Sequence, residues 1–173
     1  GMTYCYSLLN QIFNIDSLIL IDLDKEKLYG KVLDLNHSVY NLNSSTLVSM
    51  GNYSDCNDAD IVCITAGPAQ NGLKSSRMED LYKSNSIFKE IIPSIRKSGF
   101  SGIYLIASNP LDVMTYVTSK YANCDPQKVI GSGTLLDTAR LMFTLSEEFN
   151  KNSNEITGYV LGEHGDNQFI PWS

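Results

Sequence analysis

A histidine between two glycines is the residue of this chain best suited to acid–base chemistry. His164 is one of only two histidines and lies in the stretch Gly162-Glu163-His164-Gly165-Asp166. Imidazole exchanges a proton near neutral pH, and flanking glycines let the backbone bend so that the side chain is exposed at a site. His164 is therefore a candidate for proton transfer, although a loop histidine taken alone is more often a structural residue.

Asp137 and Arg140 could complete such a site. They are three residues apart in a segment with helical spacing, so both side chains lie on one side of a helix. A carboxylate can hold an imidazole in one tautomer, and a guanidinium binds a substrate carboxylate through two parallel hydrogen bonds. The same spacing also describes a surface ion pair worth under about 1 kcal/mol, and both interpretations remain open.

Asp22 and Arg77 are two further charged candidates. Asp22 ends an apolar run, where a carboxylate can accept hydrogen bonds from an adenosine ribose and repel the extra phosphate of NADP. That function requires a glycine-rich loop about 20 residues earlier, where only Gly1 occurs, as the loop's third glycine or as a tag remnant. Asp22 could equally be a helix cap. Arg77 closes the polar segment 68–76, which suits either a lid over a substrate or a solvated loop.

The elements that must position these residues alternate between short apolar runs and segments of helical period. This pattern predicts an α/β fold with a doubly wound, Rossmann-type parallel sheet. Pro93 is expected to kink or break its helix. The residues expected on the inner side of the last helix are Leu135, Ala139, Met142, Phe143 and Phe149. Strands are predicted at 17–22, 47–50, 60–67, 103–108, 129–133 and 156–161, and helices at 25–40, 78–98, 113–121 and from 134 onward.

Ligands of open α/β sheets bind beyond the carboxyl ends of the strands, where loops and helix N-termini converge. Polar or glycine residues occupy four of the predicted ends. These are Asp22, Thr65-Ala66-Gly67, Ser108-Asn109-Pro110 and Glu163-His164-Gly165.

Composition excludes several other functions. The chain has 173 residues, and 43% of them are hydrophobic. At this length about 70% of the unfolded surface can be buried without disulfide bonds or a structural metal. A net charge of −6 argues against nucleic acid or an anionic membrane as partner. The four cysteines form no C-x-x-C pair, which predicts reduced thiols and no metal site. With no apolar run near ~18 residues and no signal peptide, the expected location is the cytoplasm.

Several motifs in order resemble the NAD-dependent L-2-hydroxy acid dehydrogenases, the lactate and malate dehydrogenase family. The spacing from Arg140 to His164 is also similar to that of the family. The motifs that carry the resemblance are Leu20-Ile21-Asp22, Asp34-Leu35-Asn36-His37, Thr65-Ala66-Gly67, Ser108-Asn109-Pro110, Gly131-Ser132-Gly133-Thr134, Leu136-Asp137-Thr138-Ala139-Arg140 and Gly162-Glu163-His164-Gly165-Asp166.

The resemblance implies roles for these residues. His164 would protonate the substrate carbonyl oxygen during reduction, and Asp137 would orient it. Arg140 would bind the substrate carboxylate, and Arg77 would polarise the carbonyl group. Hydride would pass between the nicotinamide of NAD and C2 of a small 2-oxo acid. The implied cofactor-binding residues are Gly1, Asp22, Thr65, Ala66, Gly67, Ser108 and Asn109, of which Asn109 would also contact the substrate.

Substrate choice in the family depends on the loop after Thr65-Ala66-Gly67. Gln70 stands where malate enzymes place an arginine for the second carboxylate, although counting back from Arg77 gives Asn71 instead. Besides Arg77, the positively charged residue of this loop is Lys74. A buried dicarboxylate without a cation is costly, so pyruvate and L-lactate are favoured over malate. Counted back from Arg77, the loop is one residue longer than is usual in the family. This longer loop keeps branched-chain 2-hydroxy acids as an alternative substrate class.

The resemblance also implies a domain organisation. Residues 1–131 would form a dinucleotide-binding domain without its first strand and most of its glycine loop. Residues 132–173 would open an α+β substrate domain. The family's enzymes are longer than this chain, so we expect a fragment, which could be inactive alone. The family forms homo-oligomers, so a dimer or tetramer is expected.

Overall fold

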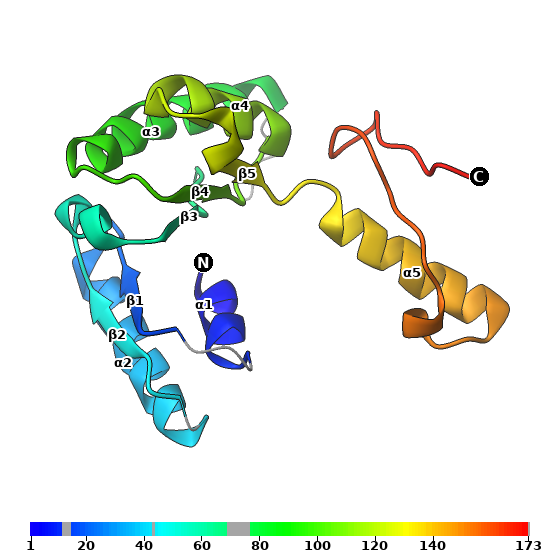
Figure 1. The fold of residues 1–173 in the computed structure, drawn as a ribbon, viewed down its shortest axis with the longest axis horizontal. Helices are drawn as coiled ribbons and strands as arrows, with labels where there is room; N and C mark the ends of the chain where they lie inside the picture. The colour runs from blue at the N-terminus through cyan, green and yellow to red at the C-terminus, as the bar shows by residue number, and fades with distance from the viewer. Residues whose placement is uncertain (12–14, 43, 69–76, 173) are drawn as a thin grey trace. The chain divides into compact units, whose positions relative to one another are not determined.

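The computed structural model describes residues 1–11, 15–42, 44–68 and 77–172, with only the backbone of Arg77 (Figure 1). The chain divides into two compact units. Unit 1 consists of Gly1–Asp60 and Ile91–Gly102, and unit 2 of Ile61–Glu90 and Ile103–Ser173. Among the described residues, no helix combines the length and the apolar character that a membrane crossing requires.

Unit 1 is built on a parallel pair of strands. β1 (Ser17–Leu20) pairs with β2 (Leu47–Met50) in a register that matches their first and last residues. α1 (Met2–Leu9) and α2 (Lys25–Asn41) pack with this pair, and η1 (Tyr53–Asp58) follows β2. The helix predicted at 25–40 is confirmed as α2, and one stripe of it is buried. The buried residues of this stripe are Leu28, Val32 and Leu35, packed with Leu9 and Val48.

Unit 2 contains a parallel sheet in the order β3-β4-β5. The strands span Ile61–Ile64, Ile103–Ile106 and Val129–Gly131, and α4 (Leu111–Ala122) packs on β4 and β5. α3 (Arg77–Lys97) contributes to both units. Each of the strands β1 to β5 lies within the range of a predicted strand, and all described ladders between strands are parallel. The expected α/β class is therefore confirmed.

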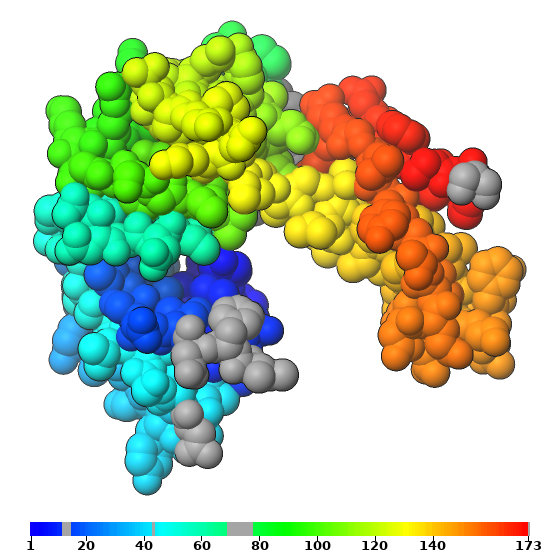
Figure 2. Space-filling model, in the orientation of Figure 1, coloured from blue at the N-terminus to red at the C-terminus, as the bar shows by residue number. Residues whose placement is uncertain are grey.

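The last part of unit 2 follows β5, which η2 (Pro126–Lys128) precedes. α5 (Leu135–Phe149) and η3 (Ser153–Glu155) lead into a segment without regular structure. Figure 2 shows the orange and red atoms of this segment lying against the yellow atoms of α5. The strand predicted at 156–161 is wrong, since only Leu161 forms an isolated antiparallel bridge, with Phe169. The N–H group of Val160 binds the side chain of Thr138 in α5, and its C=O group binds that of Thr134 at the N-cap, instead of a neighbouring strand.

Two other expectations need correction. α3 continues through Pro93 to Lys97, so a break at the proline is wrong; Ile92 and Ile95 on either side are buried, and this packing favours a continuous helix. The expected inner side of α5 is wrong for Leu135, Ala139, Phe143 and Phe149, which are exposed, whereas Met142 is half-buried. Among the residues that the structure describes, Asp137 is the buried residue of this helix.

Candidate active site

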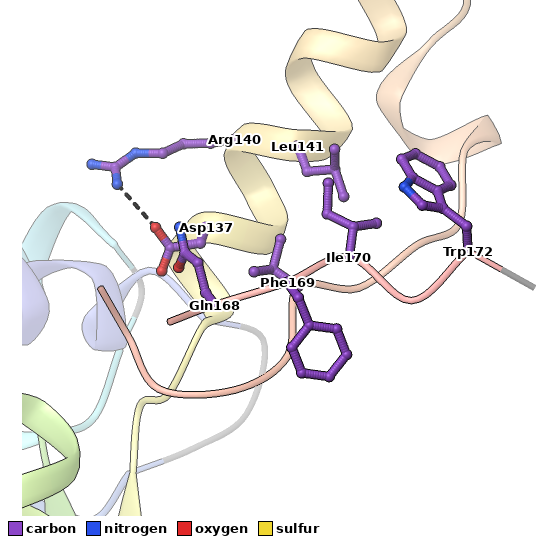
Figure 3. Close-up of a pocket in the computed structure, with 8 residues that line it drawn as sticks. Asp137, Arg140, Leu141, Gln168, Phe169, Ile170 and Trp172 are labelled. Carbon is purple, nitrogen blue, oxygen red and sulfur yellow. Dashed lines mark hydrogen bonds and ion pairs between the residues drawn. The ribbon is translucent and has the colours of Figure 1, made fainter. Parts of the chain in front are cut away.

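The first turns of α5 bring Asp137 and Arg140 into contact, as their spacing predicts (Figure 3). Nη1 of Arg140 donates to Oδ1 of Asp137 over 3.2 Å. The carboxylate is buried, whereas 65% of the arginine side chain is exposed. The guanidinium therefore keeps other N–H groups available to a ligand in solution.

A pocket of about 540 Å³ lies beside this pair. Figure 3 shows the guanidinium of Arg140 turned toward Asp137, while Leu141, Ile170 and Trp172 lie on the other side of the pocket. His164 is not among its lining residues. The pocket is lined by Asp137, Arg140, Leu141, Val160, Gln168, Phe169, Ile170 and Trp172.

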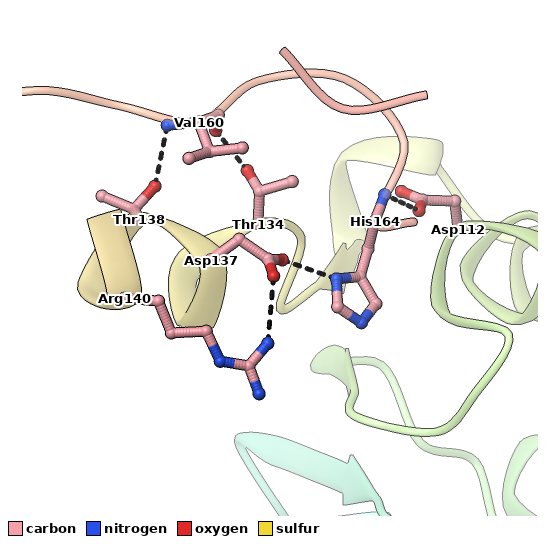
Figure 4. A network of polar contacts seen from close by, with 7 residues as sticks. All are labelled: Asp112, Thr134, Asp137, Thr138, Arg140, Val160 and His164. Carbon is pink, nitrogen blue, oxygen red and sulfur yellow. Dashed lines mark hydrogen bonds and ion pairs between the residues drawn. The ribbon is translucent and has the colours of Figure 1, made fainter. Parts of the chain in front are cut away.

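His164 meets the second oxygen of the same carboxylate. Its Nδ1 lies 2.6 Å from Oδ2 of Asp137, although 27 residues separate them in sequence (Figure 4). Because a carboxylate accepts, Nδ1 carries the hydrogen and Nε2 is the nitrogen left for proton exchange. The imidazole is 28% exposed, so it is partly shielded but not sealed from solvent.

The surroundings keep Asp137 ionised. Burial acts to raise its pKa, but the hydrogen bond from His164 and the charges of His164 and Arg140 outweigh burial, so the pKa lies below the ordinary value. An ionised carboxylate holds the imidazole in one orientation and one tautomer.

Two threonines, one at the N-cap of α5 and one in its first turn, fix the segment that leads to His164. Thr134 stands at the N-cap position, but its hydroxyl donates to the carbonyl oxygen of Val160 instead of capping the helix. The N–H of Val160 donates to Oγ1 of Thr138 over 3.0 Å. Both backbone groups of a buried residue are thus satisfied by the helix that carries Asp137. Sequence reasoning missed Thr138, whose only signal was its place one turn after Thr134.

The loop around His164 depends on its glycines. Gly162 and Gly165 adopt φ of 93° and 149°, which L side chains rarely adopt. A Cβ at Gly162 would also lie 2.9 Å from the carbonyl oxygen of Asn167. The backbone N–H of His164 donates to Oδ2 of Asp112 over 2.9 Å, a contact absent from the sequence-based prediction.

Two serines hold the strand-end loops of unit 2 together. Oγ of Ser108 donates to the carbonyl oxygen of Ile64, and Oγ of Ser84 in α3 donates to that of Asn109. Both serines are buried, whereas Asn109 is exposed. The segment Thr65-Ala66-Gly67 follows β3 directly. The ends of β3 and β4 therefore form one braced edge with Asn109 facing solvent.

Asp22 lies in unit 1, two residues beyond β1. Its carboxylate accepts from Nζ of Lys31 over 3.1 Å and from the N–H of Asp24 over 3.3 Å. Burial acts to raise the pKa of Asp22, but these two bonds and the charge of Lys31 outweigh it and lower the pKa. A pocket of about 230 Å³ adjoins it, lined by Ile21, Asp22, Leu23, Lys25, Asn52 and Tyr53.

The remaining predicted residues are placed as follows. Gly1 is the N-cap of α1, where its carbonyl oxygen accepts the N–H of Cys5. Arg77 begins α3. Gln70 lies outside the described residues, as do Asn71 and Lys74. Asp137, Arg140 and His164 form one contact network, while Gly1 and Asp22 belong to the other unit. No cluster of described residues could hold a metal ion.

Comparison with known protein families gives two matches. Residues 1–131 match the model described as the NAD binding domain of lactate/malate dehydrogenase. Residues 134–173 match the model described as the alpha/beta C-terminal domain of lactate/malate dehydrogenase. Together the two models cover almost the whole chain.

Individual relatives agree with these matches. The chain is 49% identical over 172 residues to an L-lactate dehydrogenase of Borrelia turicatae, covering 99% of this chain and 54% of the relative. It is 46% identical to an L-lactate dehydrogenase of Halalkalibacterium halodurans, covering 100% of this chain and 55% of the relative. The chain therefore spans about half the length of the curated relatives it matches.

Solved structures show the same likeness. A lactate dehydrogenase from a Medee basin deep-sea metagenome library aligns with a TM-score of 0.92 at 42% identity, over 100% of this chain and 55% of that one. The minor L-lactate dehydrogenase of Enterococcus mundtii, in its ligands-bound form, aligns with a TM-score of 0.94 at 34% identity, with the same coverage.

Proposed function

Because the chain belongs to the lactate/malate dehydrogenase family, we propose that the protein transfers a hydride between NAD and a small 2-oxo acid, with pyruvate and L-lactate as its substrate pair. The relatives above, which are L-lactate dehydrogenases, support this substrate pair. The observation that carries the proposal is the bond between Nδ1 of His164 and Asp137, which leaves Nε2 for proton exchange.

The residues present fit NAD. Asp22 is an ionised carboxylate beside a pocket, and its lining combines apolar side chains with Lys25 and Asn52, as an adenosine group requires. Thr65, Ala66, Gly67, Ser108 and Asn109 follow the carboxyl ends of β3 and β4, where such folds bind cofactors. Gly1 would approach the cofactor phosphates. When bound, the reduced nicotinamide supplies the hydride that C2 of the substrate receives.

The chain's own residues supply the proton and hold the substrate. Nε2 of His164 gives its proton to the carbonyl oxygen as that oxygen gains negative charge, and takes it back in the reverse direction. Asp137 holds Nδ1 and stabilises the protonated ring. Arg140 binds the substrate carboxylate with its free N–H groups, while Arg77 polarises the carbonyl and Asn109 orients it.

The organisation of the whole protein belongs to the proposal. Residues 1–131 would form the cofactor domain and 132–173 would open the substrate domain, a division that the ranges of the two family models support. The negative net charge favours a small-molecule partner over nucleic acid. We propose a cytoplasmic homo-oligomer, a dimer or tetramer, in line with the family.

Turnover tests the activity. The protein, expressed from its complete reading frame, should oxidise NADH with pyruvate at a higher kcat/KM than with oxaloacetate or 2-oxoisocaproate. No turnover with any of the three would contradict the activity, and a higher value for either competitor would contradict the substrate. NADH binding and turnover by the 173-residue chain alone would exclude an inactive fragment.

A variant tests the substrate specificity further. Gln70→Arg adds a cation that can pair with the second carboxylate of oxaloacetate, so the preference should move toward oxaloacetate. Asn71→Arg is the matched control, since it adds the same charge one residue later. A shift only with Asn71→Arg would contradict the role of Gln70.

A further inference from the structure

We infer that Asp112 is a positioning residue for His164, fixing the backbone of the loop that carries the imidazole. The inference rests on the proposed function for its catalytic consequence, but the contact itself is independent of that function. Asp112 lies in the first turn of α4, and its Oδ2 accepts the backbone N–H of His164 over 2.9 Å across 52 residues of sequence.

Two carboxylates hold His164 at different atoms. Figure 4 shows Asp137 reaching the ring from α5, while Asp112 reaches the backbone nitrogen from the opposite side. A bond to the ring fixes its tautomer but leaves the Cα free to move with the loop. A second bond to the backbone removes that freedom, so together they define the direction of Nε2.

The loop needs this restraint because of its glycines. Gly162 and Gly165 flank the histidine with positive φ, and glycine has the widest conformational freedom of any residue. The paired hydrogen bonds between Leu161 and Phe169, each 2.9 Å, close the base of the loop. The bond from His164 to Asp112 ties the backbone inside this loop to α4. Hydrogen bonds to a charged acceptor are stronger than neutral ones.

Asp112 also links the two halves of the reaction site. It stands three residues after Asn109, whose carbonyl oxygen is held by the buried Ser84. Asn109 is assigned to the cofactor and the substrate, and His164 to the proton. One carboxylate at the start of α4 therefore sets the proton donor relative to the strand-end loop that orients the reacting carbonyl.

The test combines two variants with a matched control. Asp112→Ala removes the acceptor, while Asp112→Asn keeps a side-chain oxygen but removes the charge. Glu26→Ala is the control, because Glu26 is an exposed acid in the first turn of α2 and far in sequence from the site. Exchange of the His164 backbone amide is followed by NMR, and kcat and KM are measured with NADH and pyruvate.

We expect amide exchange of His164 to accelerate about tenfold or more in Asp112→Ala, since a charge-assisted hydrogen bond is lost. We also expect kcat to fall about tenfold while KM for NADH stays unchanged, because the proton donor and not cofactor binding is disturbed. Asp112→Asn should recover most of both, and Glu26→Ala should change neither. If Asp112 acted only through its negative charge at the start of α4, Asp112→Asn would lose as much kcat and amide protection as Asp112→Ala.

Unchanged exchange of the His164 amide in Asp112→Ala would overturn the inference. So would equal impairment by the alanine and asparagine variants. Should the alanine variant fail to fold, protection retained in Asp112→Asn supports the bond and protection lost there overturns it. If the unsubstituted protein does not reduce pyruvate, the proposed function fails, whereas the exchange measurement still decides the role of Asp112.

Discussion

The carboxylate of Asp137 is shared, with Oδ2 2.6 Å from Nδ1 of His164 and Oδ1 3.2 Å from Nη1 of Arg140. One buried group thus connects the residue assigned to proton transfer with the residue assigned to the substrate carboxylate. A change in its charge should therefore affect both functions.

Asp137→Asn tests the orientation of His164. The amide can donate to Nδ1, which would leave the hydrogen on Nε2 and remove the negative charge that stabilises the imidazolium. We expect kcat to fall about 10²-fold or more, with NADH affinity unchanged. Glu148→Gln, an exposed change on the same helix, is the control. A kcat equal to that of the unsubstituted protein would show that Asp137 does not orient His164 for proton transfer.

Arg140→Lys tests substrate binding. Lysine keeps the positive charge but cannot form two parallel hydrogen bonds to a carboxylate, so kcat/KM for pyruvate should fall about tenfold or more. Arg96→Lys, at an exposed position near the end of α3, is the matched control. Steady-state kinetics give the result, and identical constants in Arg140→Lys would show that the guanidinium does not bind the substrate.

Local sequence patterns predicted most of the elements but not the contacts that complete the site. Apolar runs mark β1 to β5, and the spacing of Asp137 and Arg140 predicted their shared face. The bond from His164 to Asp112 joins residues 52 apart, and no periodicity carries such information. The alternation at 156–161 predicted a strand, but Thr134 and Thr138 take the backbone groups of Val160.

Asp22→Ser tests cofactor choice. The change removes the carboxylate proposed to repel the 2′-phosphate of NADP, and it releases Lys31, whose ammonium group can then pair with that phosphate. NADH should bind about tenfold more weakly, and the preference for NADH over NADPH should shrink. Fluorescence titration with each cofactor measures both affinities. Asp16→Ser, directly before the first residue of β1, is the control and should leave both affinities unchanged. If Asp22→Ser prefers NADH over NADPH as strongly as the unsubstituted protein does, Asp22 does not select the cofactor.

The lowered pKa of Asp137 predicts an acid-dependent loss of stability. Its ionised form is stabilised in the folded state, so the contribution is fully present above the unfolded value of about 3.9 and is lost as pH falls through the lower folded value. The free energy of unfolding, measured in urea from neutral to acid pH, should therefore differ most between the unsubstituted protein and Asp137→Asn at neutral pH. The difference should narrow below about pH 4. A constant difference across the range would contradict the assignment.

His164→Asn measures the central claim most directly, and His37→Asn is its matched control because the chain has only these two histidines. Pyruvate reduction is followed with saturating NADH, and NADH binding is measured separately by fluorescence. We expect His164→Asn to bind NADH normally but to lose about 10²-fold or more in kcat, while His37→Asn keeps its activity. Full turnover by His164→Asn would show that another group supplies the proton.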